Sequence, residues 1–217
     1  MKLFRILALV LVANLCLAFS AYAEPTIYTI VLDASVSIDP SDFQEENSAA
    51  AALIVAIHAA SQVDENQGKL ADFMSVAWFG GKDDYIQLPY FNASDISTVS
   101  VLATSLSDVR HPKFQNTALY SALAKATIQA LTQERDLGGT YNQVILLVTD
   151  GAENQSPYEM QQLVKEVYPN NKIFLAVIGV GGSADVSDFK KLADDVRHID
   201  DFAELAAVFT VISGMYR

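Results

Sequence analysis

The sequence predicts an α/β fold of the doubly wound kind, with a mainly parallel, six-stranded sheet that carries helices on both faces. Two observations predict this fold class. Apolar runs of strand length recur along the chain, and patterns of helical period separate most of them. Strands that alternate with helices in this way are typical of parallel sheets packed between helical layers.

The first predicted elements are a strand and a long helix. Residues 27–32 (IYTIVL) form an apolar run of strand length. Asp39 and Pro40 fit the N-cap and the first position of a helix, which we expect to run to about Gln62, with Gly68 in the turn that follows. The helix residues expected on the buried side are Phe43, Ala50, Leu53, Ile54 and Ile57.

Two strands and two helices fill the middle of the chain. Residues 73–79 (FMSVAWF) and 85–88 (YIQL) predict strands, the second of them at the sheet edge. Gly80 and Gly81 close the first strand, and Pro89 stops the second. The helices expected next cover residues 95–106 and 118–133, with a loop at His111 and Pro112 between them. We expect the second helix to end near Gly138 and Gly139.

Strands and helices alternate again in the last third of the chain. The expected strands are residues 144–148, residues 172–180 and a short edge strand at 197–199. The expected helices are residues 156–167, 186–196 and 202–215, the first of them capped by Ser156. The last helix is amphipathic, and its expected buried stripe consists of Phe202, Leu205, Val208, Phe209 and Ile212.

The N-terminal residues have the pattern of a secretory signal peptide. Two basic residues precede an apolar run over residues 6–19, and Ala21-Tyr22-Ala23 fits a cleavage site. We therefore expect residues 1–23 to be removed and residues 24–217 to form a single domain. An uncleaved membrane anchor is the alternative, although the apolar run is short for a membrane span.

The net charge and the cysteine content limit the classes of partner and the cellular compartment that we expect. The formal net charge is −12, and removal of Lys2 and Arg5 with the signal peptide makes it more negative still. Such an acidic surface argues against nucleic acid and anionic membranes as partners. The only cysteine, Cys16, lies in the signal peptide, so the mature chain would have no disulfide. We expect a monomer that is periplasmic in a bacterium, or secreted.

Three short segments, far apart in the sequence, carry oxygen ligands. Asp33, Ser35 and Ser37 (in DASVS) directly follow the first predicted strand, Thr117 opens a helical pattern, and Asp150 (in TDG) follows the strand at 144–148. In an extended chain, residues two apart point the same way, so the first three side chains can converge on one point. Carboxylate and hydroxyl oxygens at the ends of parallel strands suit a hard divalent cation.

These segments resemble the metal-ion-dependent adhesion site of the von Willebrand factor A-type domain family. That site consists of D-x-S-x-S, then a threonine, then an aspartate in a T-D-G context. The resemblance covers roughly residues 26–216, and its one departure is Gln115-Asn116 in front of the threonine, where the family often has glycine. The residues that match the site one by one are Asp33, Ser35, Ser37, Thr117 and Asp150.

The resemblance implies a Rossmann-like fold with strand order 3-2-1-4-5-6. The strands that precede Asp33 and Asp150 would then be neighbours at the point where the strand order reverses. It also implies a metal site whose hydroxyls lie near the ion and whose two carboxylates coordinate it directly or through water. The expected cofactor is Mg²⁺, with Mn²⁺ or Ca²⁺ as alternatives. The expected function is an exported protein-binding module, for adhesion or complex assembly, that ligates an exposed Asp or Glu of a partner protein.

Two other interpretations use the same residues. A purely structural ion would only tie the three loops together, and a metal-dependent hydrolase would use the ion to activate water. The hydrolase is disfavoured because the predicted shell has no obvious general base. Aspartate-nucleophile phosphatases need a second acid two residues after the first, where this chain has Ser35, and no G-x-S-x-G, P-loop or H-E-x-x-H motif is present. We therefore expect no catalysis.

Other residues of chemical interest have simpler explanations. Residues 179–184 imitate a dinucleotide-binding motif, but no second βαβ half follows them. We interpret Glu153 as a solvated loop residue, with a place around the metal ligands, one step removed from the ion, as the alternative. We interpret His58 and His198 as packing or surface residues. His111 lies in a loop that can flank the metal face.

The C-terminal helix raises the question of regulation. In related domains, as the resemblance implies, this helix can shift along the sheet and change the affinity of the metal site. Because the sequence stops at Arg217, we expect no covalently attached domain to pull on residues 202–215, and we expect the site to stay in one state. The alternative is a separate subunit that biases the position of the helix.

Overall fold

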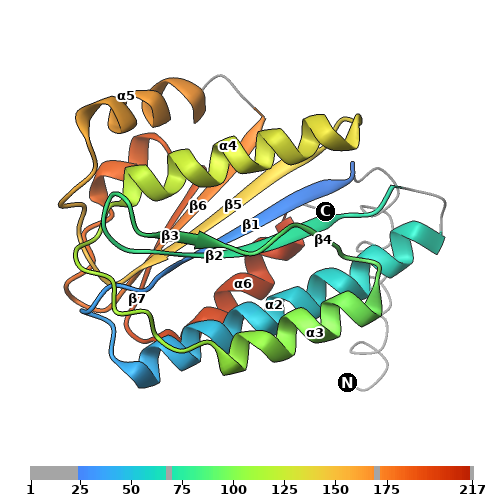
Figure 1. Ribbon diagram of the computed structural model, residues 1–217, viewed down its shortest axis with the longest axis horizontal. Helices are drawn as coiled ribbons and strands as arrows, with labels where there is room; N and C mark the ends of the chain where they lie inside the picture. Colours follow the sequence, from blue (N-terminus) through green and yellow to red (C-terminus); the bar gives the residue numbers. More distant parts are fainter. Residues whose placement is uncertain (1–23, 67–69, 169–171, 216–217) are drawn as a thin grey trace, which may run out of the picture.

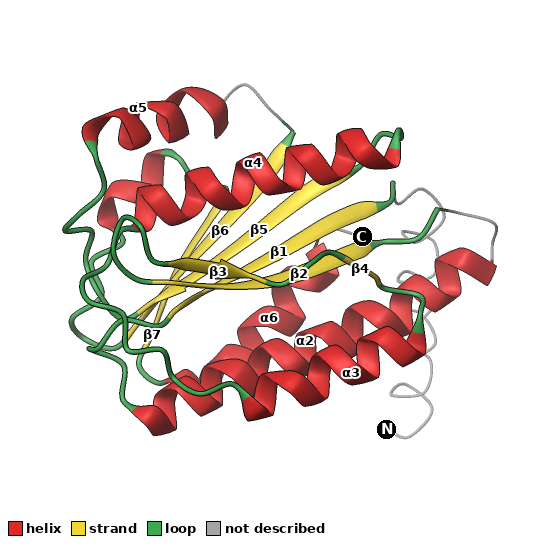
Figure 2. Ribbon diagram, viewed as in Figure 1, coloured by secondary structure: helices red, strands yellow, loops and turns green. Residues whose placement is uncertain are grey.

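The computed structural model describes residues 24–66, 70–168 and 172–215. The expected signal peptide and the expected turn at Gly68 lie outside these described residues. The molecule has three layers (Figure 1): a sheet lies between helices α4 and α5 on one face and helices α2, α3 and α6 on the other. Figure 2 shows the same layers by type of structure, with the strands between two sets of helices.

The boundaries of the elements follow the predicted ones closely in most places. The strands are β1 (Thr26–Asp33), β2 (Phe73–Phe79), β3 (Tyr85–Gln87), β4 (Phe91–Asn92), β5 (Asn142–Thr149), β6 (Ile173–Val180) and β7 (Asp195–Ile199). The α-helices are α2 (Pro40–Asn66), α3 (Ile96–Asp108), α4 (Leu119–Leu137), α5 (Tyr158–Val167) and α6 (Leu205–Met215), and two short 3-10 helices are η3 (Ser187–Lys191) and η4 (Phe202–Glu204). Within the described ranges, no helix combines the length and the apolar character that crossing a membrane requires.

The order of the strands confirms the predicted topology. The sheet runs β3-β2-β1-β5-β6-β7, and the two-residue strand β4 adds a seventh, unpredicted member that pairs with β2. β1 pairs in parallel with β2 on one side and with β5 on the other. The chain therefore builds outward from β1 to β3 and then returns to start the other half at β5. The strand order reverses between β1 and β5, where doubly wound sheets place their ligands.

Both faces of the sheet are covered, which explains why the central strands read as continuous apolar runs. Successive side chains of a strand point to opposite faces. Ile30 and Leu32 of β1 accordingly pack in the core under α2, α3 and α6, together with Phe43 and Phe209. Val31 packs in the second core, under α4 and α5. The two cores hold the strands rigidly, so the loops at the strand ends start from fixed positions.

One predicted helix is wrong. Residues 186–196 were expected to be helical, but only η3 forms there, and β7 begins at Asp195 and pairs in parallel with β6. The Asp194 backbone N–H donates to the Leu175 carbonyl, and the Asp194 carboxylate accepts the Leu175 N–H, both at 2.9 Å. Pairing with the edge of β6 therefore overrides the helical pattern of the segment. The final helix, by contrast, is confirmed, with its first turn in 3-10 form.

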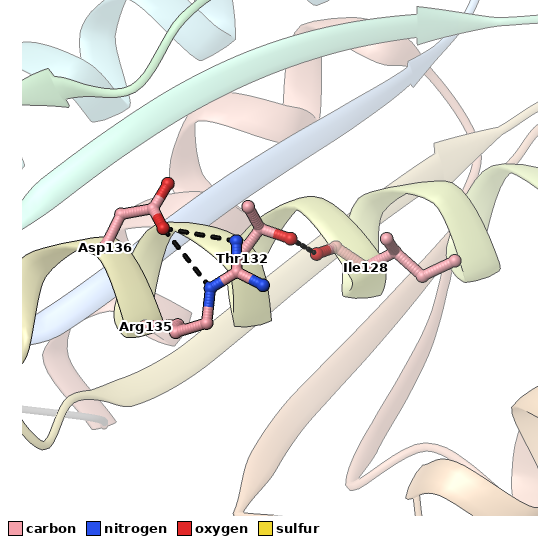
Figure 3. A network of polar contacts seen from close by, with 4 residues as sticks. All are labelled: Ile128, Thr132, Arg135 and Asp136. Carbon is pink, nitrogen blue, oxygen red and sulfur yellow. Dashed lines mark hydrogen bonds and ion pairs between the residues drawn. The ribbon is translucent and has the colours of Figure 1, made fainter.

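A predicted helix cap is also wrong. Helix α5 begins after Pro157 without a side-chain cap, because the Ser156 hydroxyl is engaged elsewhere, with Glu153 and with the N–H of Ser121. Helix α4 ends as predicted, at Gly138, whose φ of 67° is easy only for glycine. The last turns of α4 are solvent-facing and carry a local Arg135–Asp136 ion pair at 3.2 Å (Figure 3).

Candidate metal centre

The loops that follow β1 and β5 form the candidate site, at the left side of Figure 1. Leu32 of β1 is in register with Val148 of β5, so the two strands end side by side. Asp33 is the last residue of β1, and Asp150 directly follows the last residue of β5. The sheet register alone therefore brings two segments that are far apart in the sequence to one place.

Asp33 lies at the bottom of the site and is fully buried. One carboxylate oxygen accepts the Ser35 backbone N–H at 2.9 Å. The other accepts the Thr149 hydroxyl at 2.6 Å. The carboxylate of β1 is thus held by both ligand segments at once, which fixes its orientation.

Ser35, Ser37 and Asp150 form a chain of hydrogen bonds above it. The Ser35 and Ser37 hydroxyls lie 2.8 Å apart, and the Ser37 hydroxyl donates to an Asp150 carboxylate oxygen at 2.8 Å. This contact spans 113 positions of the sequence. The alternation predicted for the D-x-S-x-S segment therefore does bring its polar side chains together with the aspartate of the third segment.

Thr117 lies against the third segment. A β-carbon placed on Gly151 would come within 3.1 Å of the Thr117 hydroxyl oxygen, so glycine lets the two loops approach closely. The Thr117 backbone N–H donates to the Asn154 side-chain oxygen at 3.0 Å. Among the described residues, the Thr117 hydroxyl makes no hydrogen bond to Asp33, Ser35, Ser37 or Asp150. Its lone pairs are therefore not taken up by those four residues.

The loop before Thr117 is anchored to the first ligand segment. Phe114 exchanges backbone hydrogen bonds with Ala34 and Val36, at 3.0 and 2.9 Å. Its side chain lies against Gly80, where an added β-carbon would come within 2.1 Å of the Phe114 Cβ. Asn116 has a φ of 64°, the left-handed conformation that glycine adopts most easily. Asparagine is one of the few residues other than glycine that adopt this conformation readily, so the turn before Thr117 forms without a glycine.

Burial dominates the electrostatics of the two carboxyl groups of the site, and the only cationic influence on Asp150 among the causes of its pKa shift is a small one from His111. Burial raises the pKa of Asp33 to about 6, and the charge of Asp150 adds slightly to the rise, against the opposing hydrogen bonds. Burial also raises the pKa of Asp150, which is half-buried. None of the ion pairs among the described residues involves either aspartate. A bound cation would relieve this unfavourable electrostatic arrangement.

Glu46 is a further acid that the sequence analysis missed. It lies on the inner face of α2 and is fully buried, and neither of its carboxylate oxygens has a hydrogen-bond partner among the described residues. Burial raises its pKa well above the ordinary value and the charge of the nearby Asp33 adds to the rise, against a smaller lowering by the Asp33 backbone N–H, which lies outside normal hydrogen-bond geometry. Its spacing of three residues from Phe43, on the apolar stripe of α2, was the signal that could have revealed it.

The donor atoms present fit a hard divalent cation. They are two carboxylates and three hydroxyls, all oxygen, which is the ligand type that Mg²⁺, Mn²⁺ and Ca²⁺ prefer. No group of three or more His, Cys, Asp or Glu side chains able to hold a metal occurs in the part of the chain that the structure describes. A site here would therefore use hydroxyls and water to complete its shell, in contrast to the His- and Cys-rich sites typical of zinc proteins.

Glu153 differs from its predicted role. It was expected to be a solvated loop residue, but its carboxylate accepts the backbone N–H groups of Tyr120, Gln155 and Ser156. It therefore ties the loop after Asp150 to the start of α4. Sequence reasoning missed this role because the acceptor and the Tyr120 donor are 33 positions apart.

The histidines and the glycine-rich segment fit their simpler explanations. The Nδ1 atom of His58 lies 2.6 Å from the Ala93 carbonyl oxygen. His111 packs against Phe43 with ring centroids 4.6 Å apart, and its charge acts on Asp150, as expected of a loop beside this face. His198 is exposed. A β-carbon on Gly179 would come within 3.1 Å of the Ala184 side chain, so this glycine is needed for close packing.

Comparisons with known proteins agree with this architecture. A sequence model described as the von Willebrand factor type A domain matches residues 29–211. No curated protein sequence matches the chain. Among solved structures, a von Willebrand factor type A protein from Catenulispora acidiphila aligns with a TM-score of 0.68 and 18% identity, over 88% of this chain and 42% of that one.

Two further solved structures have the same fold at low sequence identity. Proximal thread matrix protein 1 from the mussel byssus, solved with a zinc-occupied MIDAS motif, aligns with a TM-score of 0.63 and 19% identity, over 89% of this chain and 46% of that one. The pilus adhesin SpaC from Lactobacillus rhamnosus GG aligns with a TM-score of 0.68 and 12% identity, over 89% and 30%. The present chain spans less than half of the length of each of these three proteins.

Proposed function

Because this chain belongs to the von Willebrand factor type A domain family, we propose that it is a divalent-metal-dependent protein-binding module. The observation that carries the proposal is the Ser35–Ser37–Asp150 chain of hydrogen bonds above the buried Asp33 carboxylate. These polar atoms meet at the switch point of the sheet, and neither carboxylate takes part in an ion pair among the described residues. A cation bound here would stabilise the ionised form of these buried carboxyl groups.

The ion would be held by the residues that the sequence motif singles out. The Ser35, Ser37 and Thr117 hydroxyls would lie next to it, and Asp33 and Asp150 would coordinate it directly or through water. Mg²⁺ is the proposed ion, with Mn²⁺ or Ca²⁺ as alternatives, because it keeps water ligands readily in an all-oxygen site. When bound, the ion supplies an exchangeable coordination position that a carboxylate can occupy.

The proposed partner is a protein that presents an exposed Asp or Glu. Two observations support a protein partner: the pilus adhesin and the byssus matrix protein share this fold, and the strongly acidic chain would repel nucleic acid. Asp33 is buried and already accepts two hydrogen bonds, so it is poorly placed to activate water as a general base. We therefore propose a non-catalytic, monomeric module.

A metal titration tests the proposal. Mg²⁺ or Mn²⁺ at 100 times the dissociation constant should stabilise the folded protein by about 2.7 kcal/mol, measured as a rise in melting temperature over protein kept in EDTA. Asp150→Ala should abolish the rise and still fold. Asp136→Ala is the matched control, because it removes an exposed aspartate at the far end of α4. An unchanged wild-type melting temperature in both ions would eliminate a functional metal site.

A second experiment separates partner binding from a purely structural ion. Proteins of the native cell envelope would be passed over the immobilised chain in Mg²⁺ and then eluted with EDTA. Recovery of a partner by the wild type but not by Asp150→Ala supports ligation through the ion. If the ion raises stability but the same proteins are retained in EDTA, the ion is structural.

Export is proposed on the N-terminal sequence. We propose that residues 1–23 are cleaved and that the domain of residues 24–217 acts in the periplasm or after secretion. N-terminal sequencing of the exported protein should begin at Glu24. A membrane-bound form that retains Met1 would show instead that the apolar segment serves as an anchor.

A further inference from the structure

The loop after Asp150 and the loop that carries Thr117 hold each other by a reciprocal pair of hydrogen bonds. The Thr117 N–H donates to the Asn154 side-chain oxygen at 3.0 Å, and the Asn154 N–H donates to the Thr117 carbonyl at 3.1 Å. Both backbone polar groups of Thr117 are thereby fixed by one residue. Because threonine is branched at its β-carbon, fixing its backbone also restricts the direction of its hydroxyl.

The same loop supplies the missing cap of helix α4. The helix begins after Ala118, which offers no side-chain cap. In its place, the Glu153 carboxylate accepts the Tyr120 N–H at 3.1 Å, and the Ser156 hydroxyl accepts the Ser121 N–H at 3.0 Å. A negative charge at this end is also favoured by the helix dipole. Residues 153–156 therefore bind the first turn of α4 as well as Thr117.

On its other side, the Thr117 loop is joined to the first ligand segment through Phe114. Only Gln115 and Asn116 separate this anchor from Thr117, and Asn116 has the left-handed backbone noted above. The loop is thus tied at both ends to the other two ligand segments. Its position relative to Asp150 depends on the contacts of residues 153–156.

We propose that Asn154, supported by Glu153, is a positioning residue that sets the place of the Thr117 hydroxyl against Gly151, the residue that follows Asp150. The inference rests on the proposed metal function of the same site. Asn154 itself does not touch the ion. It raises ion affinity by holding Thr117 in the binding arrangement before the ion arrives, because a hydroxyl that is already placed loses less freedom on binding.

A double-mutant cycle tests this role, with Mn²⁺ as the probe and isothermal titration calorimetry as the measurement. Asn154→Ala should weaken Mn²⁺ binding tenfold or more, a size typical of residues that orient metal ligands. In a Thr117→Ala background, the same change should have no further effect, because the hydroxyl that it positions is gone. Gln155→Ala is the matched control on the same exposed loop and should bind as the wild type does.

Asn154→Asp provides the rescue. It keeps the acceptor oxygen for the Thr117 N–H, so the Mn²⁺ affinity should recover relative to Asn154→Ala. The Mn²⁺ affinity of the same variant in the Thr117→Ala background measures what the added charge alone contributes. Melting temperatures in EDTA report whether each variant is folded. If Asn154→Asp folds and Asn154→Ala does not, the Mn²⁺ affinity of Asn154→Asp is compared with and without the Thr117 hydroxyl. An affinity that falls tenfold or more when the hydroxyl is removed supports the positioning role, and an unchanged affinity overturns it.

The outcomes separate this inference from the proposed function. If the wild type binds no Mn²⁺, both are wrong. If the wild type binds but Asn154→Ala binds equally well, only the positioning role is wrong. Equal losses of affinity with and without the Thr117 hydroxyl would also overturn it, because Asn154 would then act by another route.

Discussion

Replacing Asp33 by asparagine should stabilise the metal-free protein at neutral pH. The substitution keeps the size of the side chain and removes its charge. The asparagine oxygen can accept the Ser35 N–H as the carboxylate does. Its amide can donate to the Thr149 hydroxyl oxygen, which the structure places beside the Gly151 carbonyl as an alternative acceptor. The hydrogen bonds of the wild type therefore have counterparts in the variant.

The magnitude follows from the pKa of Asp33. Its pKa rises from the ordinary 3.8 to about 6 in the folded protein, a difference of about two units at roughly 1.4 kcal/mol each. A raised pKa means that the folded state binds the proton more tightly than the unfolded state. The resulting stabilisation is complete below pH 3.8 and is lost as the pH rises through about 6. At pH 7, the ionised Asp33 therefore costs the wild type about 3 kcal/mol.

The assay is urea denaturation of both proteins in EDTA from pH 4 to pH 7. The free energies of unfolding should be similar at pH 4, and the variant should become the more stable one by about 1–3 kcal/mol at pH 7. The pKa values of Asp150 and Glu46 are raised as well. The Asp33 charge contributes to the rise at Glu46, so the substitution also relieves this repulsion, which adds to the stability of the variant at pH 7.

Mg²⁺ should reverse the order, because it stabilises only the wild type. Asp136→Asn is the matched control, since it neutralises an exposed aspartate, and should leave the stability unchanged at every pH. An Asp33→Asn variant that is less stable than the wild type at pH 7, by an amount that does not change with pH, would refute the reasoning.

Two further predictions concern the core. Glu46→Leu removes a buried carboxyl that has no hydrogen-bond partner among the described residues; it should raise the free energy of unfolding at pH 7 by about 1–3 kcal/mol in urea denaturation, and a loss of stability would point to a partner for the carboxyl that the structure does not describe. Ile212→Ala, at a fully buried position of α6, should cost about 2–5 kcal/mol by the same assay and leave Mn²⁺ affinity in calorimetry unchanged. A tenfold gain in affinity with the fold intact would instead reveal a C-terminal helix that switches the site.

The fold could be predicted from the sequence because the apolar runs, the helical periods and the residues at helix ends all indicate the same elements. The apolar runs before Asp33 and Asp150 have strand length, and Pro40 and Gly138 mark helix ends where the structure has them. The clustering of the polar motif residues could be predicted for the same reason, since the strands they follow are neighbours. That these residues bind a metal stays a prediction.

The features that escaped prediction depend on contacts between distant parts of the chain. Ser156 has the local pattern of a helix cap for α5, but its hydroxyl instead accepts the Ser121 N–H at the start of α4. The helical spacing of Glu46 places it on the apolar stripe of α2, but the absence of a hydrogen-bond partner for its buried carboxylate depends on the tertiary packing. The start of β7 at Asp195 depends on the free edge of β6, because strand pairing outweighs a modest helical propensity.

The close packing of Gly80 on Phe114 has a consequence for how this site tolerates mutation. Any side chain at Gly80 would displace Phe114, and Phe114 in turn carries the backbone of Ala34 and Val36 with it. In a scan of all single substitutions selected for ion binding, Gly80 should therefore be as intolerant as the ligands themselves, although it contributes no ligand atom. Selection for folding alone should distinguish the ligand positions from Gly80. Replacing Asp33 by asparagine leaves the protein folded, whereas replacing Gly80 strains the fold.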